Sequence, residues 1–281
     1  MARAFTKNTS NYMNLGVGTY APVMNGATTM AFAAWCNATS LTTAATDNGI
    51  LKFVTNVDLN FFEANVDGSV TPKVLRIGAR SISTDTTQFK SATTSFTTGA
   101  WHHVGAVIDY GAATITPYMD GVAEGGGSVT FGNATLSTTA TGATQSDCLG
   151  RRNGVTPPPS TGTQWDGSIA EVAVWKDVVP SAADFAAMAL GFSPDQFATS
   201  GRIDVFRLQG QVSPETSLIS TRVGTITGTV AAADHCRIFR PKRRQFWSIP
   251  AAAGGGIVGP FYPAHLDGVS GGSIFKGQRV Q

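Results

Sequence analysis

Short apolar runs, separated by clusters of Gly, Asn, Asp and Thr, follow one another along most of the chain. Runs of this length, bounded by turn-forming residues, predict β-strands. The predicted strands are Met30–Cys36, Ile50–Val54, Leu59–Ala64, Val74–Ala79, His103–Asp109, Thr114–Met119, Val129–Phe131, Gly167–Trp175 and Ile203–Leu208, with a late strand within Gly228–His235. The run His103–Asp109 is apolar on both faces, which predicts a strand covered by a layer on each side.

One segment has helical rather than strand periodicity. Ser181 precedes it and Asp184 follows three residues later, which is a variant of the capping box that begins helices. Phe185 and Met188 then recur at helical spacing and predict a short helix packed on the core. A further turn is predicted at Ser193-Pro194, because Pro favours the first turn of a helix.

The composition favours the same class of fold. The chain has 281 residues, of which 14% are charged, with 32 Gly and only four Glu. Helical proteins usually carry more Glu, Lys and Leu, because these residues lose little entropy in a helix. The formal net charge of +2 excludes a protein that binds polyanions through bulk electrostatics.

Targeting signals and cysteines point to folding in a reducing compartment. No apolar run approaches 18 residues, so no membrane span is predicted. The N-terminus lacks the apolar segment of a signal peptide, so we expect synthesis in the cytoplasm without export. Cys36, Cys148 and Cys236 are widely spaced and predict buried free thiols, with one disulfide plus a free thiol as the alternative.

The last forty residues differ from the rest in composition. A basic run leads into them and is followed by an aromatic pair. Together these form the predicted docking segment: Arg237, Arg240, Lys242, Arg243, Arg244, Phe246 and Trp247. A Gly-rich tail then runs to the end, so we divide the chain into a sandwich, 1–244, and an extension, 245–281. Docking on an acidic protein surface is favoured over nucleic-acid binding, since the rest of the chain has no matching basic patch.

Two blocks of sequence carry a family resemblance. Phe96–Tyr110 contains Trp-His-His-Val and is followed by Ile115–Gly121, which ends in Tyr-Met-Asp-Gly. Trp165–Trp175 contains Gly-Ser-Ile-Ala-Glu-Val and precedes the predicted helix. These blocks resemble laminin G-like, concanavalin A-like jelly rolls. The resemblance spans residues 8–240, with its specific motifs within 96–191. It implies an all-β, antiparallel β-sandwich jelly roll with one short helix and an extended C-terminal tail.

Individual residues in the two blocks fit that fold. Asp120-Gly121 predicts a tight hairpin turn. Pro117 departs from the family pattern and predicts an edge or a bulge, because Pro cannot donate to a ladder. Trp101 is expected to fill the space between the sheets. Glu171, on an otherwise apolar strand, requires a polar partner.

The carboxylates do not favour catalysis. Glucanases of this fold carry their acid and nucleophile as E-x-D-x-x-E on one strand, where alternate residues share a face. The four glutamates here are isolated: Glu63, Glu124, Glu171 and Glu215. A non-enzymatic protein is therefore predicted, with a glycoside hydrolase as the least favoured alternative.

Binding residues are predicted on two grounds. Exposed aromatic rings stack on sugar faces, and the candidates for glycan binding are Tyr110, Tyr118, Trp165 and Trp175. Laminin G-like domains can hold Ca²⁺ at the sandwich rim, and Asp120 and Asp166 lie near predicted turns. No cofactor is required by the motifs, and Ca²⁺ is the one ion that the resemblance implies.

The whole arrangement, with a Gly-rich tail after a basic run, resembles laminin G-like proteins of tailed bacteriophages. This resemblance implies a structural protein of the virion surface, as a capsid decoration or a component of a tail or fibre. Its expected partners are other virion proteins, further copies of itself in a homo-oligomer such as a trimer, and a host or environmental glycan. The alternative is a freestanding carbohydrate-binding module or lectin. Neither reading involves a membrane.

Overall fold

The computed structural model describes residues 2–7, 11–43, 48–54, 60–138, 145–151, 164–209, 213–228, 230–236 and 238–239. All of them belong to one compact unit, Met1–Arg240. The predicted extension, 245–281, lies outside the described residues. So does the whole predicted docking segment: Arg237, Arg240, Lys242, Arg243, Arg244, Phe246 and Trp247.

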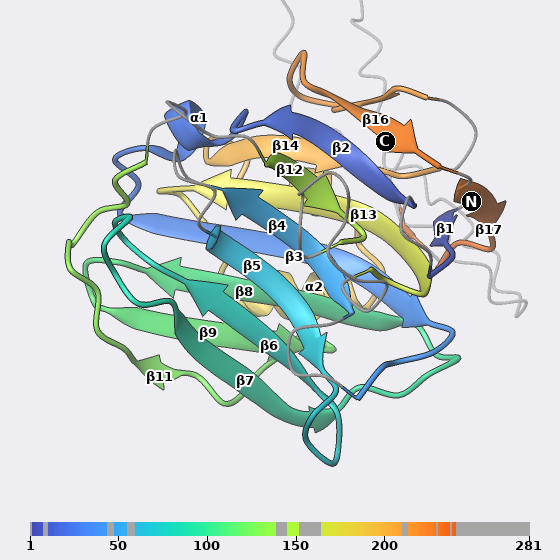
Figure 1. Ribbon diagram of the computed structural model, residues 1–281, viewed down its shortest axis with the longest axis horizontal. Coiled ribbons are helices and arrows are strands. Elements are labelled where there is room, and N and C mark those ends of the chain that lie inside the picture. The colour runs from blue at the N-terminus through green and yellow to red at the C-terminus, as the bar shows by residue number, and fades with distance from the viewer. Residues whose placement is uncertain are drawn as a thin grey trace, which may run out of the picture. The chain divides into compact units, whose positions relative to one another are not determined.

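The first of two antiparallel sheets forms the rear layer of the sandwich in Figure 1. Its strands are β1 (Ala2–Phe5), β3 (Thr29–Ala38), β8 (His102–Asp109), β9 (Thr114–Met119), β10 (Val122–Ala123), β11 (Gly127–Ser128), β13 (Gly167–Lys176), β14 (Arg202–Phe206) and β17 (Val230–Ala233). The order is β10–β9–β8–β3–β13–β1–β17, with β11 paired to β9 and β14 paired to β13. The late strand expected within Gly228–His235 is β17, which pairs with the N-terminal strand β1.

The second sheet lies in front of the first in Figure 1. Its strands are β2 (Tyr12–Val17), β4 (Gly49–Val54), β5 (Asn60–Asp67), β6 (Val74–Ala79), β7 (Gln88–Ser95), β12 (Ser146–Leu149), β15 (Glu215–Thr216) and β16 (Val223–Thr227). They are ordered β15–β16–β2–β12–β4–β5–β6–β7. The helical elements are short: α1 (Ala21–Met24), α2 (Ala182–Ala189) and the 3-10 turn η2 (Pro194–Gln196). The predicted fold class, an antiparallel β-sandwich with a short helix, is confirmed.

The core lies between the sheets and is built by alternation along each strand. In β8, Val104, Ala106 and Ile108 belong to the large apolar cluster between the two layers. The intervening positions point outward, where Gly105 lies beneath the ring of Phe185 from α2. Strand β8 is therefore covered on both faces, as its continuous apolar run predicts.

Helix α2 begins where the capping box was predicted. The hydroxyl of Ser181 accepts the N–H of Asp184, and the Asp184 carboxylate accepts the N–H of Ser181. Phe185 and Met188 are buried against the outer face of the first sheet, where Phe185 stacks on Tyr118 with ring centroids 4.0 Å apart. The predicted turn at Ser193-Pro194 is η2.

The hairpin between β9 and β10 also follows its sequence signal. Asp120 and Gly121 both have positive φ, at 49° and 85°, which is the conformation of a two-residue type I′ turn. A Cβ on Gly121 would lie 2.8 Å from Ala186 Cα, so the glycine lets α2 approach the turn. On the side of β9 away from β8, the strand pairing is interrupted at Pro117. Strand β10 pairs with positions 118 and 119 of β9, and β11 pairs with positions 114 and 115. Pro117 therefore lies at a break in the pairing along β9 and not at an edge of the sheet, since β10 and β11 both pair with β9 on that side.

Glu171 is buried and has the polar partners that its strand position requires. It has a φ of 49° at a bulge in β13. The hydroxyl of Ser193 donates to Oε2 at 3.2 Å, and His235 Nε2 lies 3.4 Å from Oε1. The bulge turns the Glu171 carboxylate away from the apolar side chains of β13 and toward polar groups that bind it.

Two expectations about packing are wrong. Trp101 does not fill the space between the sheets; it packs with Trp35 in a small cluster outside the main core. The space between the sheets contains Trp165 instead, whose ring meets Phe96 edge to face at 5.7 Å. Val129–Phe131 is not a strand, because the short pairing with β9 ends at Ser128.

All three cysteines are free and buried, which confirms the prediction of buried thiols over a disulfide. Burial raises the pKa of Cys148 to about 12, so this thiol is protonated and unreactive at neutral pH. Within the described part of the chain, none of the helices combines the length and the apolar character needed to span a bilayer.

Candidate ligand pocket

A pocket of about 380 Å³ opens beside the paired strands β2 and β16. Its walls come from two segments far apart in sequence, which the register Thr225↔Asn14 brings together. The lining residues are Asn14, Leu15, Gly16, Thr19, Thr221, Arg222, Val223 and Thr225. The volume falls in the range of about 300–1,000 Å³ that small-molecule sites occupy.

The end of β2 is shaped by a glycine. Gly16 has a φ of 101°, and a Cβ there would lie 2.2 Å from the hydroxyl oxygen of Thr19. Only glycine therefore allows Thr19 to fold back over the strand end and line the pocket. Asn14 fixes the same turn, because its Oδ1 accepts the N–H of Gly16 at 2.8 Å. Its Nδ2 donates to no described residue and is available to a ligand.

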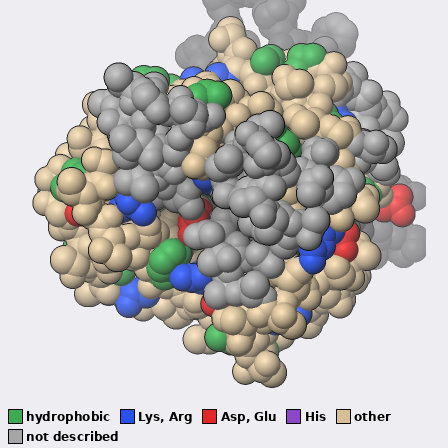
Figure 2. Space-filling model, viewed as in Figure 1, with side chains coloured by type: hydrophobic (Ala, Val, Ile, Leu, Met, Phe, Trp, Pro, Cys, Tyr) green, Lys and Arg blue, Asp and Glu red, His purple; other side chains and the backbone are tan. Residues whose placement is uncertain are grey.

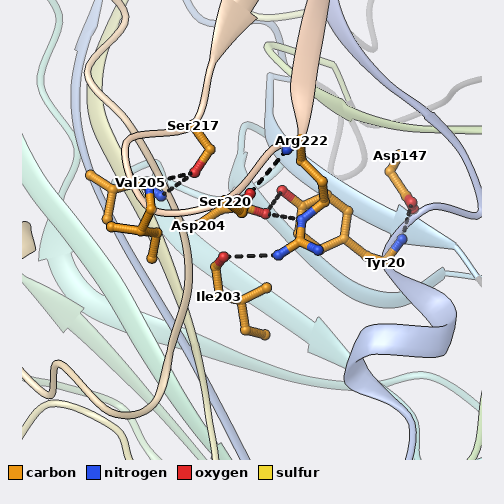
Figure 3. Close-up of polar contacts among 9 residues, drawn as sticks. Tyr20, Asp147, Ile203, Asp204, Val205, Ser217, Ser220 and Arg222 are labelled. Carbon is orange, nitrogen blue, oxygen red and sulfur yellow. Dashed lines mark hydrogen bonds and ion pairs between the residues drawn. The ribbon is translucent and has the colours of Figure 1, made fainter.

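A buried ion pair holds the opposite wall in place (Figure 3). Arg222 Nε lies 2.5 Å from Oδ2 of Asp204, which is completely buried on β14 of the other sheet. Arg222 Nη2 donates to the carbonyl of Ile203 at 2.8 Å. The hydroxyls of Tyr20, at 2.6 Å, and of Ser220 donate to the same Asp204 carboxylate. The loop 217–222 is thereby tied to both sheets.

Tyr20 links this network to a second buried carboxylate. Its backbone N–H donates to Asp147 Oδ2 at 2.9 Å (Figure 3). The backbone N–H of Val54 donates to Asp147 Oδ1 at 2.8 Å. Burial raises the pKa of Asp147 to about 7, although the backbone N–H groups of Tyr20, Val54 and Thr19 favour the charged form. Burial, together with Asp204, also raises the pKa of the Tyr20 hydroxyl well above 10.0. Thr19 and Tyr20, next to the pocket, are therefore positioned by a titratable group.

The surrounding surface carries charges of both signs. Figure 2 views the molecule from the side of the second sheet and shows basic and acidic side chains interspersed over this face. Such a surface suits a neutral polar ligand better than a polyanion.

The aromatic residues predicted to bind glycans do not form an exposed platform. Their exposed fractions lie between 0% and 7%, and they are Tyr110, Tyr118, Trp165 and Trp175. Tyr118 and Trp175 pack under α2, whereas Tyr110 and Trp165 lie in the core between the sheets. Burial of the ring faces within the protein leaves none of them free to stack on a sugar, and this prediction is corrected.

The two predicted metal ligands lie in separate places and bind groups of the protein. Asp120 accepts hydrogen bonds from His102 Nδ1 at 2.8 Å and from the N–H of His103 at 2.9 Å. Asp166 accepts the hydroxyl of Ser40 at 2.5 Å. Among the described residues, no three His, Cys, Asp or Glu side chains gather as a metal site would require. The structure therefore does not bring Asp120 and Asp166 together, and Ca²⁺ binding stays a prediction.

Sequence reasoning missed every residue of the pocket. Asn, Thr and Gly are common in turns, so nothing marks these positions as binding residues before β2 and β16 are paired. One signal was available, because Asp204 interrupts an apolar run just as Glu171 does. A buried acid of this kind requires a polar partner and would have pointed to Arg222 or another base.

The chemistry of the pocket is that of hydrogen bonding. It offers one amide, three hydroxyls and one guanidinium edge, and the described lining residues include no carboxylate. Glycoside hydrolysis needs a pair of carboxyl groups on either side of the bond. The described lining residues can therefore hydrogen-bond a polyhydroxylated ligand, and they do not include such a pair.

The fold is an antiparallel β-sandwich with a polar pocket beside β2 and β16. Residues 7–186 match the family model of the concanavalin A-like lectin/glucanases superfamily, of the laminin G type, and the chain belongs to that superfamily. No curated protein sequence matches significantly.

Several solved structures are similar to this chain at low sequence identity. A putative carbohydrate binding protein from Bacteroides ovatus is 18% identical, with a TM-score of 0.59 over 83% of this chain and 60% of that one. This chain thus spans about 60% of that protein's length. A heptameric SAP-like pentraxin from Limulus polyphemus is 14% identical, with a TM-score of 0.49 over 67% of this chain and 81% of the pentraxin. The CBM40 of Ruminococcus gnavus IT-sialidase, bound to α2,3-sialyllactose, is 12% identical, with a TM-score of 0.47 over 67% of this chain and 98% of the module.

Proposed function

We propose that this protein binds glycans in the pocket between β2 and β16 and does not hydrolyse them. The observation that carries the proposal is the pocket lining, in which hydroxyl and amide groups surround a cavity of about 380 Å³ and the described residues provide no carboxylate. Membership of a lectin-containing superfamily, and the fold shared with a putative carbohydrate binding protein, support the same conclusion.

The pocket is preorganised for such a ligand. Arg222 and the loop that carries it are held by Asp204, and Thr19 is held by the turn at Gly16. Rigid polar walls lower the entropy lost on binding, because few side chains need to be ordered by the ligand. Without an aromatic platform among the described lining residues, a single site should bind weakly, and several copies on one particle would bind through avidity.

Removal of two pocket hydroxyls tests the assignment. We expect the double variant Thr221→Val, Thr225→Val to bind its glycan about tenfold more weakly, because each lost hydrogen bond contributes about 0.5–1.5 kcal/mol. The full chain is first screened on a glycan array, and the affinity for the best ligand is then measured by titration calorimetry.

Thr227→Val is the matched control. Thr227 lies on the same strand and the same face as Thr225 but does not line the pocket, so its loss should leave the affinity unchanged. Equal weakening by both substitutions, or an unaltered affinity in the double variant, would place the ligand elsewhere.

The sequence further leads us to propose that the sandwich is displayed on a phage virion, as a capsid decoration or a component of a tail or fibre. The support is the resemblance of the whole arrangement to tailed-bacteriophage proteins, with the basic run and the extension 245–281 as the segment that docks on virion proteins or on further copies in a trimer. The chain should then co-sediment with purified particles. A chain recovered only as a free, glycan-binding protein would favour the alternative, a freestanding lectin.

A further inference from the structure

Three side chains at one end of the first sheet form a continuous hydrogen-bonded series. The hydroxyl oxygen of Thr97 lies 2.8 Å from Nε2 of His102. Nδ1 of the same imidazole lies 2.8 Å from Oδ2 of Asp120. A hydroxyl, an imidazole and a carboxylate in this order, each within hydrogen-bond reach of the next, is the geometry that activates a nucleophilic alcohol.

The backbone fixes which imidazole nitrogen carries the proton. The N–H of Thr97 points at His102 Nε2 at 3.4 Å, and an N–H group can only donate. Nε2 is therefore the acceptor, and the proton of the neutral ring lies on Nδ1, where it is donated to Asp120. In this tautomer the Thr97 hydroxyl donates to Nε2, so the imidazole is ready to take its proton.

The carboxylate is held independently of the histidine. Asp120 lies in the type I′ turn after β9, and its Oδ1 accepts the N–H of His103 at 2.9 Å. Burial acts to raise the pKa of Asp120, but the hydrogen bonds from His102 and His103 outweigh it and lower the pKa. The ring of Phe96, 4.7 Å from the imidazole, limits the ring's rotation. The series is thus oriented by the turn, by the strand and by an aromatic neighbour.

The hydroxyl end of the series is accessible. Thr97 is exposed, so a ligand can reach its oxygen. No described residue accepts the backbone N–H of Thr98. In hydrolases with a nucleophilic alcohol, the N–H of the following residue commonly stabilises the oxyanion.

We propose that Thr97, His102 and Asp120 form a second site, which cleaves small acyl esters. The Thr97 oxygen bonds to the ester carbonyl carbon while its proton moves to His102 Nε2. The carbon–alkoxide bond then breaks, the alkoxide takes the proton from Nε2, and an alcohol leaves the acyl group on Thr97. Water attacks the acyl-threonine, gives one proton to Nε2, and releases the carboxylic acid as the proton returns to Thr97. This site is independent of the glycan pocket, which lies on the other sheet.

The test measures release of 4-nitrophenolate from 4-nitrophenyl acetate by the full chain. Thr97→Val removes the nucleophile while keeping the shape of the side chain, and we expect the rate above background to fall at least about tenfold. His102→Gln should lower the rate similarly, whereas Thr97→Ser should retain it. Peptide mapping after an acid quench should find the acetyl group on Thr97.

A nearby threonine serves as a control that distinguishes catalysis by Thr97, His102 and Asp120 from nonspecific acylation of exposed hydroxyl groups. Thr94 is also exposed, but its hydroxyl donates to Glu124 rather than to a histidine, so Thr94→Val should leave the rate unchanged. Because Thr97 is exposed, its replacement should not alter the melting temperature. The proposal is overturned if the Thr97→Val protein releases nitrophenolate at the wild-type rate, or if the acetyl group is found only on lysines or the N-terminus.

Discussion

Replacement of Asp204 by Ala is expected to lower the free energy of unfolding by about 3–5 kcal/mol, the usual effect of breaking a buried ion pair. Asp204 is completely buried and accepts hydrogen bonds from Tyr20, Ser220 and Arg222. Its loss leaves the buried Tyr20 hydroxyl without its acceptor and removes the carboxylate that pairs with Arg222, whose side chain is 24% exposed. An unpaired polar group in the interior is destabilising. The loop 217–222 should loosen as well, so glycan affinity should fall with stability.

A second aspartate provides the matched comparison. Asp195 also forms an ion pair with an arginine, Arg207, at 3.4 Å, but both side chains are about 30% exposed. An ion pair of that exposure contributes at most about 1 kcal/mol, so Asp195→Ala should have a small effect. Urea denaturation of the two variants measures the loss in the free energy of unfolding that each substitution causes. Similar losses in the two proteins would mean that Asp204 does not organise the interior.

Replacement of Asp147 by Asn is expected to change how stability depends on pH. Burial raises the pKa of Asp147 from 3.8 to about 7 in the folded protein. Its contribution to stability is therefore complete below about pH 3.8 and is lost as the pH rises to about 7, by about 4 kcal/mol at 1.36 kcal/mol per pKa unit.

The contribution of His103 to stability depends on pH in the opposite direction. Burial lowers its pKa from 6.5 to about 4. Its contribution is present above pH 6.5 and is lost as the pH falls to about 4, by about 3 kcal/mol. Between those two pH values the two residues oppose each other, because the folded state keeps a proton on Asp147 and excludes one from His103. Their joint contribution should be nearly independent of pH in this interval.

Single substitutions should reveal the two opposed contributions to the free energy of unfolding. Relative to the wild type, Asp147→Asn should lose about 3 kcal/mol on acidification from about pH 6.5 to 4, and His103→Gln should gain a similar amount. Chemical denaturation at a series of pH values measures both slopes, and the titration of other groups cancels in the comparison. Parallel pH profiles for all three proteins would show that neither group is buried in an abnormal protonation state.

The sequence predicted those parts of the fold whose signals are local. The capping pair Ser181 and Asp184, the turn at Asp120-Gly121 and the apolar run of β8 each specify their own conformation, and the structure contains all three. Strand β7 went unpredicted, because it lies at the end of the second sheet and is mostly polar and half-buried. An edge strand of this kind has little hydrophobic alternation to detect.

The candidate sites depend on contacts that no local signal contains. Tyr20 and Asp204 are 184 positions apart, yet they share a hydrogen bond. Aromatic residues in a sandwich are found both in cores and in ligand sites, and residue type alone did not show that Trp165 and Trp175 lie inside. The series from Thr97 to Asp120 required the hairpin and the start of β8 to be placed together before its order was visible.

Amide hydrogen exchange of the full chain, with and without the glycan selected on the array, tests the proposed function most directly. We predict slower exchange on binding in residues 14–19 and 221–225, the two segments that line the pocket, and unchanged exchange near Thr97. Slower exchange confined to other segments, or the absence of any bound glycan on the array, would contradict the assignment of this pocket as a glycan-binding site.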